Sequence, residues 1–120
     1  MPASVVQVMF RHLTGSRATQ VDAFPVGAHR ELILGRAPSA AVRFPPAHDG
    51  AVGRQHARIE PLDDAGRFRL VDLGSRNGTW LNGRRLAGPA ELRSGDIVQL
   101  GLGGPRLEFL VACAATPSRG

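Results

Sequence analysis

Two Asn-Gly pairs, separated by only three residues, constrain this chain more than any other feature of its sequence. The pairs are Asn77-Gly78 and Asn82-Gly83, and the apolar-rich segment Thr79–Leu81 lies between them. Asn-Gly beside apolar residues is a strong signal for a tight hairpin turn, because both residues tolerate positive φ angles. The sequence therefore predicts that the chain turns twice around one very short strand, Thr79–Leu81.

The residues before the first turn are candidates for binding. Ser75, Arg76 and Asn77 are expected on a rigid, exposed loop, the kind of position where binding residues are common. They offer a hydroxyl, a guanidinium and a carboxamide, which suit anionic oxygens and the backbone of a partner. On local evidence alone, the alternative is that both Asn-Gly pairs serve only as turns.

Period-two alternation of apolar and polar residues dominates the rest of the chain, and helical periodicity is absent. Strands are expected within 6–11, 56–60, 67–70 and 106–111, each with one buried and one solvated face. Turn signals separate them, among them Gly103-Gly104-Pro105. Short strands with such punctuation favour an all-β fold, a two-sheet antiparallel β-sandwich. We expect one domain over residues 1–115 and a disordered tail or linker over 116–120.

Composition limits the compartment and the chemistry. Cys113 is the single cysteine, so no internal disulfide forms and a reducing compartment is favoured. No apolar run approaches the ~18 residues of a membrane span, and no basic residue precedes Val5 as a secretory signal would require. These features predict a cytoplasmic protein without direct membrane insertion.

All 15 basic residues are arginine, and the net charge is +5. Arginine is the better bidentate partner for phosphate, although the absence of lysine is also typical of a GC-rich, bacterial-type coding bias. The arginines are scattered rather than gathered into a stripe, and aromatic residues make up only 5% of the chain. Nucleic-acid binding through this arginine-rich surface is therefore the least favoured function.

Four blocks in a fixed order carry a family resemblance. They are Gly35-Arg36, Gly53-x-x-His56, the stretch Asp72–Gly83 that holds both Asn-Gly pairs, and Gly95–Gly101. In this order the blocks resemble the forkhead-associated (FHA) domain, over roughly residues 5 to 112. The resemblance implies a two-sheet β-sandwich of the FHA type with recognition loops at one end. It also implies binding to a partner protein phosphorylated on threonine, such as a Ser/Thr kinase or its substrate.

The resemblance assigns roles to individual residues. Arg36 and Arg54 would face the phosphate, and Ser75 would contact the phosphate or the peptide backbone. Asn77 would hydrogen-bond the peptide main chain beside the phosphothreonine. Arg76 would read a residue a few places further on, where an acidic residue is favoured.

Other matching positions support the loops rather than touch the ligand. Gly35, His56 and Gly78 belong to this group. Gly53 departs from the family, which usually has a phosphate-binding serine there, and a lost hydroxyl donor costs about 1–3 kcal/mol. The backbone N–H of Gly53 is expected to remain as a donor. The module is therefore expected to bind phosphothreonine weakly, with phosphate-independent protein interaction or assembly as the alternative.

Catalysis and metal binding are not expected, and no cofactor is implied. The glycine-rich segment Gly101–Gly104 lacks the lysine and Ser/Thr of a nucleotide-binding loop, and a hairpin turn suffices to explain it. The histidines share no metal-ligand spacing with one another or with Cys113. The sequence therefore indicates a protein-interaction module rather than an enzyme.

Overall fold

The computed structural model describes residues 4–25, 30–45, 50–62 and 67–114. Within these ranges the chain forms β-strands and no helix, so no helix there could span a membrane. The predicted tail, 116–120, lies outside the described residues. The strands are β1 (Ser4–His12), β2 (Val21–Pro25), β3 (Leu32–Gly35), β4 (Val42–Arg43), β5 (Ala57–Pro61), β6 (Phe68–Asp72), β7 (Thr79–Leu81), β8 (Arg84–Arg85), β9 (Ala90–Leu92), β10 (Ile97–Leu100) and β11 (Arg106–Ala114).

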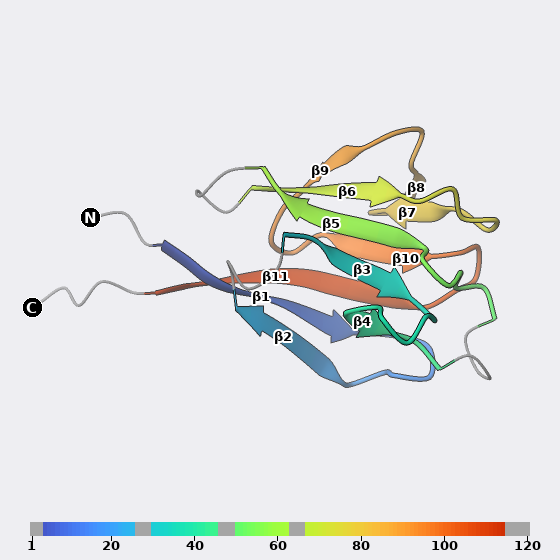
Figure 1. The fold of residues 1–120 in the computed structure, drawn as a ribbon, viewed down its shortest axis with the longest axis horizontal. Coiled ribbons are helices and arrows are strands. Elements are labelled where there is room, and N and C mark those ends of the chain that lie inside the picture. Colours follow the sequence, from blue (N-terminus) through green and yellow to red (C-terminus); the bar gives the residue numbers. More distant parts are fainter. Residues whose placement is uncertain (1–3, 26–29, 46–49, 63–66, 115–120) are drawn as a thin grey trace, which may run out of the picture.

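The strands form two sheets that pack face to face (Figure 1). One sheet has six strands in the order β2-β1-β11-β10-β7-β8, and the other has five in the order β4-β3-β5-β6-β9. Every pairing is antiparallel except that of β3 with β4, which is parallel. The predicted all-β two-sheet sandwich is confirmed, with this one parallel pair as an exception to the antiparallel prediction.

The alternation read from the sequence decides which side chains meet between the sheets. In β11, Leu107 and Phe109 are fully buried while Arg106 is exposed. Phe109 packs against Phe10 of β1 and Phe68 of β6, with ring centroids 5.6 and 5.3 Å apart. Because Phe10 and Phe68 come from different sheets, these contacts join the two layers. The layered core fixes the strand ends, and with them the loops.

The predicted double turn is present. Strand β7 covers Thr79–Leu81, as expected, and a two-residue turn joins it to β8. Asn82 and Gly83 have φ angles of 51° and 84°, so both lie in the left-handed region that a type I′ turn requires. The Asn82 side chain secures the turn by accepting from Ile97 N–H and donating to Asp96, at 2.8 and 3.0 Å.

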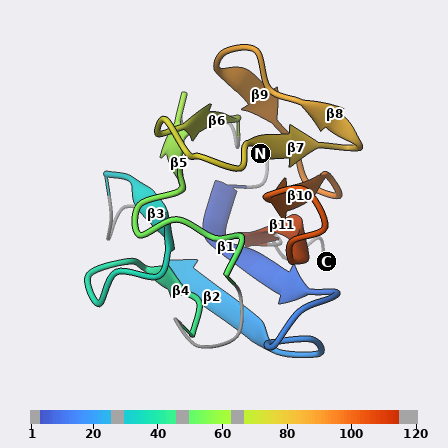
Figure 2. The ribbon, with the colours of Figure 1, turned by 90° about the vertical axis from the view of Figure 1, so that its right-hand side faces the viewer.

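Five connections gather at one end of the sandwich, opposite the start of β1 and the end of β11 (Figure 1). They follow β1, β3, β4, β6 and β10, and Figure 2 looks directly onto them. The blocks that carry the family resemblance contribute residues to four of these connections, those after β3, β4, β6 and β10. The fold therefore brings Arg36, Gly53 and Asn77 to the same end, although they are far apart in the sequence.

Candidate functional site

The loops after β3 and β4 lie against each other through their backbones. Arg36 N–H donates to the Gly53 carbonyl and Ala37 N–H donates to the Arg54 carbonyl, both at 3.0 Å. Gly35 makes this approach possible, since a Cβ at that position would lie 2.1 Å from the Arg54 carbonyl oxygen. No side chain larger than hydrogen fits there, so Gly35 positions Arg36 beside Arg54.

His56 connects these loops to the loop after β6. Its ring is completely buried; Nδ1 accepts from Gly53 N–H at 2.9 Å, and Nε2 lies 2.7 Å from the Gly78 carbonyl. Nε2 must therefore carry the proton, because both partners are then satisfied. Burial disfavours the charged ring and holds the pKa of His56 below its ordinary value, although the Gly78 carbonyl and the Asp72 carboxylate act in the opposite direction. The ring is a neutral connector between two loops.

Hydrogen bonds to the Gly78 carbonyl join three of the connections at this end. It accepts from His56 Nε2 and also from Gly101 N–H, at 2.9 Å, which ties in the turn after β10. Gly78 has a φ of 82°, which orients this carbonyl inward and favours glycine at the position. The left-handed residue of the first Asn-Gly pair is therefore Gly78, while Asn77 keeps an ordinary negative φ.

Asp72 organises the loop that ends at Gly78. One carboxylate oxygen accepts from the backbone N–H groups of Gly74 and Ser75, at 3.0 and 3.1 Å. The other accepts from the hydroxyls of Ser75 and Thr79, at 2.5 and 2.6 Å. Burial by itself would raise the pKa of Asp72, but the hydrogen bonds from Ser75 and Thr79 outweigh it, so the pKa lies below its ordinary value.

Within this arrangement the Ser75 hydroxyl is engaged by its own loop. Its hydroxyl proton is donated to Asp72, and its oxygen accepts from Gly78 N–H at 3.0 Å. The sequence prediction made Ser75 a contact to phosphate or peptide, whereas in the structure the hydroxyl holds the loop in shape. The Ser75 hydroxyl thus supports the loop through Asp72 and Gly78, and its predicted contact with a ligand stays a prediction.

Asn77 lies exposed at the tip of the same loop. Its Nδ2 donates to the Ala51 carbonyl at 3.0 Å, which joins the loops after β4 and β6 at the surface above His56. One amide hydrogen and the carboxamide oxygen are not used in this contact. Asn77 is therefore held in place with donor and acceptor capacity left over.

Three arginines come from these same loops. Arg36 is partly buried and its Nε donates to the Val52 carbonyl, which leaves its two terminal nitrogens available. Arg54 and Arg76 are exposed. Within the described residues, none of the three has a carboxylate within salt-bridge distance. Several other arginines do: the pairs are Arg11–Glu108, Arg17–Asp22, Arg58–Glu60, Arg69–Glu60 and Arg93–Glu91.

Gly53 has space for a larger side chain, but its backbone N–H already donates a hydrogen bond. Its N–H is donated to His56, so the prediction that this N–H remains available to a phosphate is wrong for this conformation. A Cβ built on Gly53 would lie 3.7 Å from His56 Nδ1, an ordinary contact distance, and its φ is not in the left-handed region. A serine would therefore fit without strain, and only the chemical group is missing.

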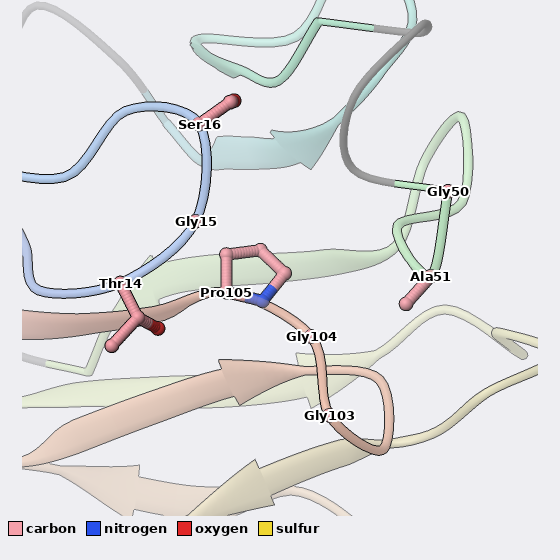
Figure 3. A pocket seen from close by; sticks show the side chains of 8 residues that line it. All are labelled: Thr14, Gly15, Ser16, Gly50, Ala51, Gly103, Gly104 and Pro105. Carbon is pink, nitrogen blue, oxygen red and sulfur yellow. The ribbon is translucent and has the colours of Figure 1, made fainter.

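A hollow of about 480 Å³ adjoins these loops (Figure 3). Figure 3 shows Thr14 and the turn Gly103–Pro105 on one side and Gly50 with Ala51 across from them. Ala51 also carries the carbonyl that Asn77 contacts, so the hollow borders the surface already described. Its walls are mostly backbone and small side chains, and among its lining residues only Thr14 and Ser16 bring polar side chains.

Sequence reasoning missed Arg85. Its guanidinium carbon lies 5.4 Å from the centroid of the Trp80 ring, a cation–π distance, and the side chain extends over Gly78. The signal was present, because a two-residue turn at Asn82-Gly83 pairs Trp80 with Arg85 on one face of the hairpin.

The fold and this surface define a β-sandwich interaction module that presents arginines without carboxylate partners on braced loops. Comparison with known proteins identifies the module. The FHA domain family model matches residues 32–101, and the chain belongs to the FHA domain family. Two relatives come from the bacterial genera Corynebacterium and Mycolicibacterium. An oxoglutarate dehydrogenase inhibitor of Corynebacterium efficiens is 34% identical and spans 82% of this chain and 76% of its own. The glycogen accumulation regulator GarA of Mycolicibacterium smegmatis is 33% identical and spans 73% of this chain and 63% of its own.

Solved structures agree with this assignment. One FHA structure, from work on phosphothreonine-dependent FHA domain interactions, superposes with a TM-score of 0.69 at 26% identity, over 92% of this chain and 98% of its own. The kinase-interacting FHA domain of an Arabidopsis kinase-associated protein phosphatase superposes with a TM-score of 0.75, over 97% of this chain and 100% of its own. At 23% identity, the second likeness supports the fold alone.

Proposed function

We propose that this module binds a partner protein at a phosphorylated threonine. Arg36 and Arg54 would hold the phosphate, and Asn77 would bond the peptide main chain beside it. The observation that carries the proposal is the gathering of Arg36, Arg54 and Arg76 without carboxylate partners among the described residues, on loops that His56 braces. Phosphate brings nearly two negative charges and three acceptor oxygens, which such a cluster can neutralise.

The partner class follows from the same chemistry. A threonine phosphorylated by a Ser/Thr kinase supplies the anion, and the kinase itself or one of its substrates would carry it. A relative named as an inhibitor and another named as a regulator support a regulatory role without catalysis. We place the interaction in the cytoplasm of a bacterium, because both relatives are bacterial.

Gly53 sets the expected strength. The usual serine hydroxyl is absent and the Gly53 N–H is engaged by His56, so two donors that could serve a phosphate are lost. One hydrogen bond to a charged acceptor is worth about 1.5–3 kcal/mol, so binding is expected to be about one to two decades weaker than with serine. The same two losses favour phosphate-independent protein interaction as the second candidate function.

Calorimetric titration separates the two functions. The ligands are a degenerate phosphothreonine peptide library, its unphosphorylated counterpart and a phosphoserine version. The proteins are the wild type, Arg36→Ala, Gly53→Ser and the control Arg93→Ala, which removes the same charge from the β9–β10 connection. We expect wild type to bind only phosphothreonine, Arg36→Ala to lose binding and Arg93→Ala to retain it.

Gly53→Ser decides between a weakened site and an inactive one. Tighter binding of phosphothreonine than in wild type, by about tenfold or more, would support a weakened working site. Binding that appears only in Gly53→Ser would contradict the proposal for the natural chain and favour a phosphate-independent partner. Equal binding of phosphorylated and unphosphorylated peptides would contradict it as well.

A further inference from the structure

Arg85 is held in a fixed place rather than extended freely into solvent. The type I′ turn pairs Trp80 with Arg85, and the guanidinium carbon lies 5.4 Å from the centre of the Trp80 ring. A Cβ built on Gly78 would lie 2.7 Å from Nε, 3.0 Å from Cζ and 3.1 Å from Nη2 of Arg85. The guanidinium therefore lies close to both the indole ring and the backbone of Gly78, a residue whose φ of 82° favours glycine.

This position adjoins the proposed phosphopeptide site. Gly78 directly follows Asn77, the residue that bonds the Ala51 carbonyl at the centre of the loop surface. The Gly78 carbonyl is bonded to His56, so the backbone beneath Arg85 belongs to the braced part of the site. If the main chain of a bound peptide is bonded to Asn77, peptide residues a few positions from that bond would come near Arg85.

Among the described residues, no carboxylate neutralises the charge of Arg85. The side chain is exposed, and no carboxylate of the described residues lies within salt-bridge distance of it. Contact with Trp80 leaves the edge of the guanidinium, with its N–H donors, free to meet an anion. A cation that is already positioned loses less conformational entropy on binding than a freely rotating one.

From these observations we propose that Arg85 reads a second anionic group on the bound peptide, a few residues from the phosphothreonine. The group is a carboxylate or a further phosphate, since both match the planar guanidinium. The inference rests on the proposed phosphothreonine function and extends it to sequence selectivity. Arg76, which the sequence favoured for this task, is exposed and has no comparable support.

A peptide scan tests the inference. The probes are fluorescein-labelled phosphothreonine peptides with alanine at neighbouring positions, in which one aspartate is moved along both flanks. A second set carries phosphoserine in place of the aspartate, and this set distinguishes the two sources of the anion. A third set carries lysine there. Binding is measured by fluorescence anisotropy with wild type, Arg85→Gln, Arg85→Glu, Arg76→Gln and the control Arg84→Gln, whose partner on β7 is Leu81.

We expect wild type to prefer an anion at one position by about three- to fivefold, as for a well-placed exposed ion pair. Arg85→Gln should remove this preference, Arg85→Glu should replace it with a preference for lysine there, and Arg84→Gln should weaken all peptides alike. The preference should also shrink at high salt.

Other outcomes would overturn the inference in distinguishable ways. Phosphothreonine binding without an anion preference, or a preference removed by Arg76→Gln and kept by Arg85→Gln, would refute the role of Arg85 alone. Absence of phosphothreonine binding in wild type would refute the proposed function together with this extension of it. Thermal unfolding of each variant shows that it is folded, and the reversed preference of Arg85→Glu cannot arise from misfolding.

Discussion

Replacement of His56 gives the most informative test of how the loops are held. His56→Ala removes the acceptor of Gly53 N–H and the donor to the Gly78 carbonyl, and it empties a completely buried site. The partly buried Gly53 N–H would lose its acceptor at a cost of up to about 1–3 kcal/mol, whereas the Gly78 carbonyl keeps its bond from Gly101 N–H. With the lost packing of the ring, the free energy of unfolding should fall by about 3–5 kcal/mol.

Two further substitutions separate the bonds. Asparagine can place an oxygen where Nδ1 lies, and so keep the acceptor for Gly53 N–H. Glutamine can place an N–H where Nε2 lies, and so keep the donor to Gly78. Because only the loss of the Nδ1 acceptor leaves a partly buried group, the Gly53 N–H, without its protein partner, His56→Asn should cost about 1–2 kcal/mol and His56→Gln about 2–3 kcal/mol.

Urea unfolding followed by fluorescence measures these differences, since Trp80 is the only tryptophan and lies in β7. The order of destabilisation should be alanine, then glutamine, then asparagine. If glutamine were tolerated as well as asparagine, the acceptor at Nδ1 would not be the important contact. If alanine cost less than about 1 kcal/mol, the bracing role of His56 would be refuted.

Three further predictions concern the same framework. Gly35→Ala should lower the free energy of unfolding by about 3 kcal/mol or more, because the new Cβ would lie 2.1 Å from the Arg54 carbonyl oxygen. The control Gly88→Ala, whose Cβ would have no atom within 4 Å, should be nearly neutral in the same urea titration. The free energy of unfolding should fall in two stages on acidification. The first stage begins below about pH 6.5, where the unfolded chain protonates His56, which the fold keeps neutral. The second begins below about pH 3.8, where the unfolded chain protonates Asp72 before the folded chain does. Melting temperatures measured against pH would show both stages, and His56→Gln should weaken the first. Asn82→Ala should cost about 2 kcal/mol, since it removes the bonds to Asp96 and Ile97 and since alanine tolerates a φ of 51° less well than asparagine does. Chemical denaturation of Asn82→Gly separates the two causes, because glycine loses the bonds but adopts this φ without strain.

Features fixed by neighbouring residues were predictable from the sequence. Strand Thr79–Leu81 and the turn at Asn82-Gly83 follow from local φ preferences, and the buried positions of β11 follow from strict alternation. The order of strands in each sheet did not follow from local pattern, because it depends on contacts between distant segments. The parallel pairing of β3 with β4 is one such case.

The site residues divide in the same way. The motif blocks placed Arg36, His56 and Asn77 on neighbouring loops, and the fold brings those loops together. Side-chain hydrogen bonding could not be read from the motif: Asp72, three residues earlier, engages the Ser75 hydroxyl, and the predicted contact of Ser75 with phosphate or peptide stays a prediction. Arg85 was missed because its place depends on the Trp80 ring and on the space above Gly78.

The departure at Gly53 is best understood as a change in binding chemistry rather than in folding. Glycine is required at Gly35 by a neighbouring backbone and favoured at Gly78 by a positive φ, but neither reason applies at Gly53, where a Cβ would fit. The buried bonds around His56 involve only the backbone N–H of Gly53, which serine would also supply. Stability therefore should not distinguish glycine from serine there, and any large difference between them must appear in the affinity for an anion.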